Sequence, residues 1–192
     1  MELKMPLKGP KPEDVTKLHN EINQLLNQRF ILTTLALTLF GVLTAWMIPK
    51  DAGTENVAFP FAISIVISTL LLAIYAWSDQ IRLSARALSS YLEETGNSNW
   101  ETDWREFIRV RGFWSQTKQQ TVIFLLLMTI NVISPYVVLV LLSTFTPSFL
   151  AGVSSTWGAV LGAAIYGIGF HNLFDRENNI EQTWKKLNSH SK

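Results

Sequence analysis

The 192-residue chain contains no cysteine. Its absence excludes disulfide bonds, thiolate metal sites, iron–sulfur clusters and a catalytic thiol. Charged residues are scarce, at 16% against about 25% in an average soluble domain. They are also unevenly placed, because residues 30–49, 56–78 and 119–172 contain no Asp, Glu, Lys or Arg. Uncharged stretches of this length exclude a disordered chain and indicate a multi-pass membrane protein.

Four segments are long enough to cross a membrane as helices, which takes about 20 apolar residues each. They are residues 30–48, 57–77, 121–142 and 148–170. The last two belong to one uncharged stretch that is too long for a single span and is divided by a segment rich in Ser, Thr and Pro. Each central charge would cost about 2.5–3.5 kcal/mol to insert, so four charge-free segments favour spans over buried helices of a soluble protein. We therefore predict an all-α fold, a four-helix transmembrane bundle with cytoplasmic helical extensions.

The basic residues predict how the chain is oriented. All of the sixteen Lys and Arg residues except Lys50 lie in three regions, which are the N-terminal tail (1–29), the central loop (79–118) and the C-terminal tail (171–192). Because Lys and Arg accumulate in cytoplasmic loops, these regions are expected in the cytoplasm and the hairpins 30–78 and 119–170 in the membrane. The expected location is a bacterial inner membrane. Acidic residues in the first tail are unlike the basic start of a secretory signal peptide, so the first span is expected to remain in the protein.

The N-terminal tail carries a helical pattern of its own. Val15, Leu18, Ile22 and Leu25 recur at three- and four-residue spacing, which predicts an amphipathic helix. Such a helix could lie on the membrane surface, pack on the central loop or pair with a copy of itself. Its polar face is rich in amides, whereas helices that lie on lipid are rich in Lys and Arg. Packing within the protein or an oligomer is therefore favoured.

The central loop is predicted to be a helical hairpin. Four apolar residues beyond span two keep the helical spacing, namely Ile81, Ala85, Leu88 and Leu92. Span two should therefore continue as a helix until Gly96. Ser98 and Glu101 have capping-box spacing and predict a second helix over residues 100–110. The C-terminal tail has a weaker helical pattern.

The fourth span carries small residues, which allow close helix packing in membranes. Gly158 and Gly162 form a GxxxG pair, and Ala159, Ala163 and Gly167 form a neighbouring ridge. These residues predict a contact face, either against another span of the same chain or against a second copy.

The third span contains Asn131, Ser134 and Pro135. Proline inside a helix removes a hydrogen bond and frees a carbonyl. A buried Asn nearby is expected to bond that carbonyl or another helix, and interhelical bonding is the favoured explanation. A path for a solute or an ion is the alternative, because polar groups at depth often mark such paths.

Several kinds of chemistry have no residues to support them. No predicted span contains Asp, Glu, Lys, Arg or His, which argues against a proton-coupled transporter with a buried carboxylate and against a membrane metalloenzyme. The chain has no GxSxG elbow and no Walker A or dinucleotide fingerprint. Its histidines, His19, His171 and His190, are scattered. We therefore predict no catalytic, cofactor-binding or metal-binding residues and no enzyme activity, with action of His171 on a lipid headgroup as the least favoured alternative.

Aromatic and basic residues gather in and directly after the second predicted helix of the central loop, at Trp100, Trp104, Arg105, Arg109 and Arg111. Acidic residues are interleaved with them, so nucleic acid is not expected as a partner. Contact with anionic lipid is favoured over contact with a cytoplasmic protein.

Two stretches carry a resemblance to known proteins, LHNEINQLLNQRFILTTLALTLFGV (18–42) and SSYLEETGNSNWETDW (89–104). They resemble uncharacterised small multi-pass membrane proteins of bacteria. Their layout is also similar to the SLATT-type two-span effector modules of bacterial defence systems, over about residues 12–104. The four predicted spans depart from that two-span pattern. The resemblance implies an oligomeric membrane effector that perturbs the bilayer when a cytoplasmic partner signals.

Two functions follow as hypotheses. The first is a non-enzymatic, homo-oligomeric membrane effector or scaffold, coupled to a cytoplasmic partner, with pore formation in antiviral defence as its most concrete form. The second is a small transporter or channel subunit with a solute path near the third span. The expected partners are membrane lipid, further copies of the chain and a cytoplasmic protein, and no cofactor is expected.

Overall fold

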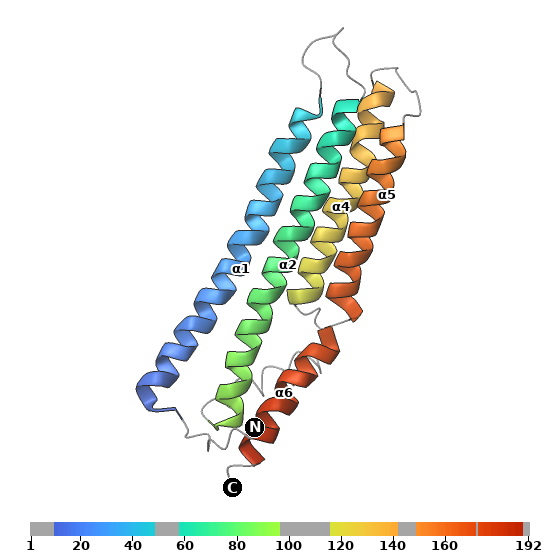
Figure 1. The fold of residues 1–192 in the computed structure, drawn as a ribbon. Helices are drawn as coiled ribbons and strands as arrows, with labels where there is room; N and C mark the ends of the chain where they lie inside the picture. Colours follow the sequence, from blue (N-terminus) through green and yellow to red (C-terminus); the bar gives the residue numbers. More distant parts are fainter. Residues whose placement is uncertain (1–9, 49–57, 97–115, 142–148, 172, 190–192) are drawn as a thin grey trace.

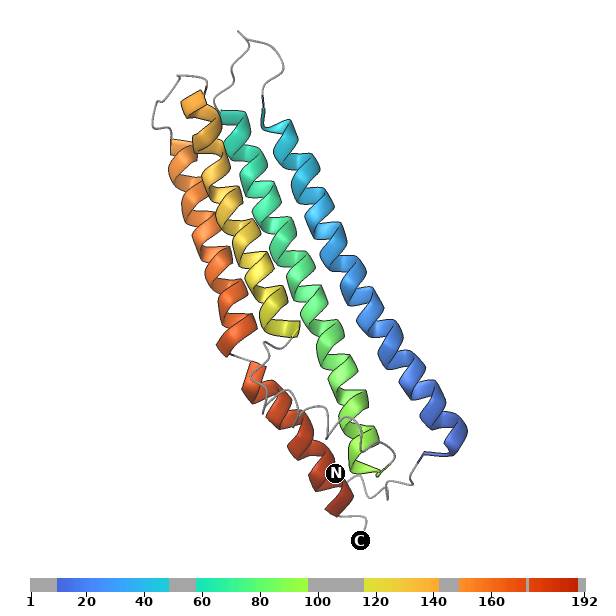
Figure 2. The same ribbon diagram turned by 180° about the vertical axis from the view of Figure 1, so that it is seen from behind.

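The computed structural model describes residues 10–48, 58–96, 116–141, 149–171 and 173–189. They form six helical segments, which are α1 (Pro12–Trp46), α2 (Ala58–Glu94), α4 (Gln116–Leu141), α5 (Phe149–Tyr166), the π-helix η1 (Gly167–His171) and α6 (Leu173–Ser189). Helices α1, α2, α4 and α5 run side by side, and α6 lies at one end of the bundle beside α2 (Figures 1 and 2). We call this end the α6 end and the opposite one the far end.

Four helices are long and apolar enough to cross a membrane: α1, α2, α4, and α5 together with the start of η1. The all-α prediction is confirmed, and the protein is an integral membrane protein with four transmembrane helices. Their limits differ from the predicted spans chiefly where a helix continues beyond the apolar run.

Helix α1 unites two predicted segments, because the amphipathic tail helix and the first span form one unbroken helix of 35 residues. Pro12 stands in its first turn, where the missing N–H costs little, and Glu13 and Asp14 complement the helix dipole there. In the apolar part, the hydroxyls of Thr34 and Thr38 donate to carbonyls four residues earlier. This satisfies the hydroxyls within the helix itself.

Helix α2 is central to the bundle, since it contacts α1, α4, α5 and α6. Its 37 residues give a length of about 55 Å at 1.5 Å per residue. The predicted continuation of span two as a helix is confirmed, and the length of α2 exceeds the roughly 30 Å of a hydrocarbon core. The chain leaves the helix at Gly96, whose φ of 71° is the left-handed conformation that commonly stops helices.

One heptad stripe runs along the buried face of α2, from the membrane part into the extension. Its members are Ser64, Ile67, Leu71, Ile74, Ser78, Ile81, Ala85, Leu88 and Leu92. Helix α1 has a matching stripe at Arg29, Leu32, Ala36, Leu39 and Leu43, whose apolar members pack in one core cluster with apolar residues of α2. This spacing is typical of coiled-coil seams. On α2 the stripe is shared between neighbours, because Ser64 and Ser78 bond α4 whereas apolar members pack in the same cluster as α1.

Helix α1 is nevertheless the least enclosed span. Only 11% of its apolar window is buried, against 28–39% in the other three. It packs on α2 and touches α4, and it leaves large side chains such as Phe30 and Trp46 exposed. Its outer face is therefore available to lipid or to another protein chain.

Candidate functional site: a buried polar layer

A layer of polar side chains crosses the bundle toward the α6 end of the spans. We call it the polar layer, and its members are Arg29 and Thr33 of α1, Tyr75, Ser78, Asp79 and Arg82 of α2, and Gln120 and Thr121 of α4. All except the partly buried Thr33 are buried. Burying such groups is costly unless they are hydrogen-bonded, so their partners show how the layer is held.

Gln120 connects three helices through one amide group. Its Nε2 donates to the Thr33 hydroxyl of α1 at 2.9 Å and to the Ser78 hydroxyl of α2 at 2.6 Å. Gln120 itself belongs to α4 and is buried. Movement of any of these three helices therefore strains or breaks a bond at this point.

The fourth span also reaches the layer, through the π-helix η1. The hydroxyls of Tyr75 and Thr121 lie 2.8 Å apart and share a hydrogen bond. Gly169 of η1 packs directly on this pair, and a Cβ at Gly169 would collide with both side chains. Single π-turns inside α-helices are frequent at functional sites. Here the wider turn brings the end of the fourth span against α2 and α4.

The layer contains a buried ion pair within α2. Arg82 donates from Nε and Nη2 to Oδ1 of Asp79, at 3.0 and 2.9 Å. Arg29 of α1, which is also buried, lies close enough to Tyr75 for an electrostatic interaction, as do Asp79 and Arg82. Removing one partner of a buried pair typically costs about 3–5 kcal/mol. These charges therefore tolerate little rearrangement around them.

Beyond the layer, α6 is fastened to the extension of α2. Arg86 of α2 and Glu181 of α6 form an ion pair. One helical turn farther along, the rings of Tyr91 and Trp184 pack with centroids 5.0 Å apart. The C-terminal helix thus lies on the same long helix that crosses the membrane.

Asn131 makes interhelical hydrogen bonds, as predicted. Its Nδ2 donates to the Ser64 carbonyl and to the Ser68 hydroxyl of α2, both at 2.8 Å. Pro135 cannot donate to the carbonyl of Asn131 four residues earlier. That carbonyl instead accepts bonds from the hydroxyls of Ser64, at 3.1 Å, and Ser134, at 3.0 Å. These bonds use the polar residues of the third span for helix packing, and the side-chain oxygen of Asn131 has no partner among the described residues.

The small residues of the fourth span face two directions. A Cβ on Gly158 would collide with Val132 of α4, and one on Gly162 would lie 3.5 Å from Met128. The GxxxG pair therefore serves packing within the chain. Ala159 and Ala163 are exposed on the outer side, and a Cβ on Gly167, in η1, would meet nothing within 4 Å.

Some predicted contact residues cannot be placed. Trp100, Trp104, Arg105, Arg109 and Arg111, with the helix predicted over 100–110, lie outside the described residues. So does the side chain of His171, whose backbone belongs to η1.

The polar layer itself was missed from the sequence, although a signal for it existed. Arg29 precedes span one, Asp79 follows span two and Gln120 precedes span three, so each marks the same side of the membrane. Comparison with known proteins adds no assignment to this geometry, because no protein-family model, no curated protein and no solved structure matches the chain.

Proposed function

We propose that the protein is a non-enzymatic, homo-oligomeric membrane effector or scaffold that couples a cytoplasmic partner to its transmembrane bundle. One observation carries the proposal. Helices α1 and α2 both run without interruption through the polar layer, and α2 continues into the extension that holds α6. A force applied to the extension therefore reaches the spans through stiff helices.

The polar layer supports this role because it links all four spans at one depth. Gln120 joins α1, α2 and α4, and Gly169 seats the end of the fourth span on Tyr75 and Thr121. A buried polar network of this kind favours one arrangement of the helices, because any other arrangement leaves buried polar groups without hydrogen bonds. A partner that shifts α2 or α6 would thus change the packing of the whole bundle, which is how such a protein could open a pore or disturb the bilayer.

The proposed assembly draws its support from α1. This span is the least enclosed, and its outer face carries exposed apolar residues along the membrane segment. Ala159 and Ala163 offer a second outward face of small residues on α5, of the type that promotes helix association in membranes.

Native mass spectrometry in lipid nanodiscs tests the oligomer. The expected result is a multiple of 21.7 kDa, and a monomer at all protein concentrations would contradict the proposal. A second protein retained from the host would identify the partner. Selective solute flux through liposomes containing the monomer would favour a transporter instead.

The coupling can be tested separately with spin labels, since the chain has no native cysteine to remove. Labels at Thr38 of α1 and Leu126 of α4, both exposed in the membrane part, would report the α1–α4 distance. Arg86→Glu releases α6 and should shift or broaden this distance. Lys185→Glu, an exposed charge reversal on α6, is the matched control and should leave it unchanged. An unaltered distance in Arg86→Glu would show that α6 is not coupled to the spans.

A further inference from the structure

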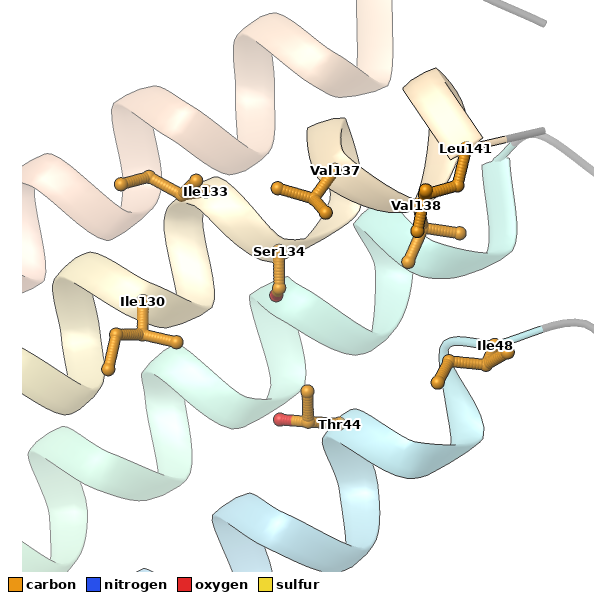
Figure 3. Close-up of a pocket in the computed structure, with 8 residues that line it drawn as sticks. All are labelled: Thr44, Ile48, Ile130, Ile133, Ser134, Val137, Val138 and Leu141. Atoms are coloured by element: carbon orange, nitrogen blue, oxygen red, sulfur yellow. The ribbon is translucent and has the colours of Figure 1, made fainter. Parts of the chain in front are cut away.

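A groove lies between α1 and α4 in the far half of the membrane part, over α2 (Figure 3). Its volume is about 440 Å³, and its lining residues are Thr44, Ile48, Ile130, Ile133, Ser134, Val137, Val138 and Leu141. Several of these aliphatic side chains are half exposed, among them Ile133 at 53% and Val137 at 50%. The groove is therefore open sideways, toward the hydrocarbon of the bilayer.

The two hydroxyl groups of the lining do not make the groove polar. The Ser134 hydroxyl is within reach of two acceptors inside the protein, the Asn131 carbonyl at 3.0 Å and the Met47 sulfur at 3.4 Å. The Thr44 oxygen is enclosed by protein and has no hydrogen-bond partner among the described residues. What remains on the surface is almost entirely hydrocarbon, which suits an apolar occupant and offers a polar solute nothing to bind.

The size and the surroundings of the groove indicate its occupant. Its volume of about 440 Å³ falls within the 300–1,000 Å³ typical of sites for small ligands. Because the lining is aliphatic and the groove opens toward the hydrocarbon of the bilayer, the small apolar ligand within its reach is the acyl chain of a lipid.

We propose that this groove binds one acyl chain of a bilayer phospholipid, from the leaflet at the far end. The acyl chain enters between Ile48, two residues beyond α1, and Leu141, at the end of α4, and runs toward Ile130. It supplies the apolar contacts that α1 lacks on its α4 side. The site is independent of the proposed effector function, because it depends only on the packing of α1 against α4 within one chain.

A photoreactive phospholipid tests the site in the intact protein. The protein is reconstituted in detergent-free nanodiscs with phosphatidylcholine that carries a diazirine along one acyl chain, and crosslinks are mapped by mass spectrometry. The expected result is labelling concentrated on residues 44–48 and 130–141, well above the labelling of Val66 and Leu70, which are also exposed. Even labelling of all exposed apolar positions would overturn the proposal, as would weaker labelling in the groove.

Matched variants show whether the concentrated labelling depends on the groove. Val137→Trp fills it and should reduce groove labelling about tenfold, equivalent to about 1.4 kcal/mol of affinity. Val140→Trp places the same ring on an exposed position of α4 outside the lining and should leave labelling intact. Ile133→Trp is a second filling variant, for use if Val137→Trp does not fold. Equal labelling in the filled and control variants would refute the site.

Discussion

Replacing Gln120 with Leu tests the polar layer directly. The substitution keeps a side chain of similar size and removes the amide that bonds Thr33 and Ser78. Thr33 keeps its other hydrogen bond, in which its hydroxyl donates to the Arg29 carbonyl at 3.1 Å. Interhelical hydrogen bonds in membranes average about 0.6 kcal/mol and reach about 1.7 kcal/mol. Losing two of them should lower the free energy of unfolding by about 1–3 kcal/mol.

Reversible unfolding in mixed micelles measures this loss, and a double-mutant cycle assigns it. Gln120→Leu and Ser78→Ala should show a coupling energy of about 0.6–1.7 kcal/mol, because each removes one end of the same bond. Thr129→Val is the control, since Thr129 is exposed on α4 and its hydroxyl donates only within its own helix. It should change the unfolding free energy little.

The same variant should also loosen α1. Spin labels at Thr38 and Leu126 report the α1–α4 distance, and Gln120 supplies a direct bond between these two helices. The distance distribution should broaden in Gln120→Leu and stay narrow in Thr129→Val. A zero coupling energy with Ser78 together with an unchanged distribution would refute the idea that the layer holds the spans together.

Three further outcomes follow from the contacts. Gly158→Leu should lower the free energy of unfolding by at least about 1–3 kcal/mol, because the larger side chain overpacks against α4. Ala159→Leu, on the outer side of α5, should not lower it. Equal losses in an unfolding titration in micelles would show that α5 is rotated from its described position. Adding Glu181→Arg to Arg86→Glu should restore the α2–α6 distance measured between spin labels, because the ion pair is re-formed with its charges exchanged. A distance that stays altered in the double variant would show that this ion pair does not dock α6. Asn131→Leu should leave the free energy of unfolding within about 1 kcal/mol of the original. The variant loses two weak interhelical hydrogen bonds, but it also removes a buried oxygen that has no partner among the described residues. A larger loss in the same titration would show that this oxygen is bonded.

The parts of the fold that depend on hydropathy or on helical spacing could be predicted from the sequence. Runs without charge located the four spans, and helical spacing beyond Asp79 predicted the extension of α2. The first apolar run begins only after Arg29, so hydropathy predicts the tail helix and the first span as two segments. The free energy of membrane insertion changes at a charged residue, but a charged residue does not interrupt the backbone hydrogen bonds of a helix. Helix α1 therefore continues through Arg29.

The direction in which small residues face could not be predicted in the same way. Gly158 and Ala159 both belong to ridges that allow close approach, and hydropathy is nearly the same on the two sides. The choice depends on the shape of the neighbouring helices, where Val132 and Ser68 approach Gly158. Packing of this kind is a property of the assembled bundle and has no counterpart in a single segment.

The polar layer determines the axial register of α1 and α2, which the heptad stripes alone leave ambiguous. Apolar seams on α1 and α2 repeat every seven residues, so the two helices could slide by one heptad, about 10.5 Å, and still match apolar faces. Such a slip would carry Arg29 into the hydrocarbon, where a charge costs about 2.5–3.5 kcal/mol or more, or carry it away from the layer toward water. Gln120 would lose Thr33 or Ser78 in either direction. A single polar residue can specify register in a coiled coil, and a layer shared by three helices specifies it for the bundle. The residues that contribute least to apolar burial therefore determine where the extension of α2 stands relative to the membrane.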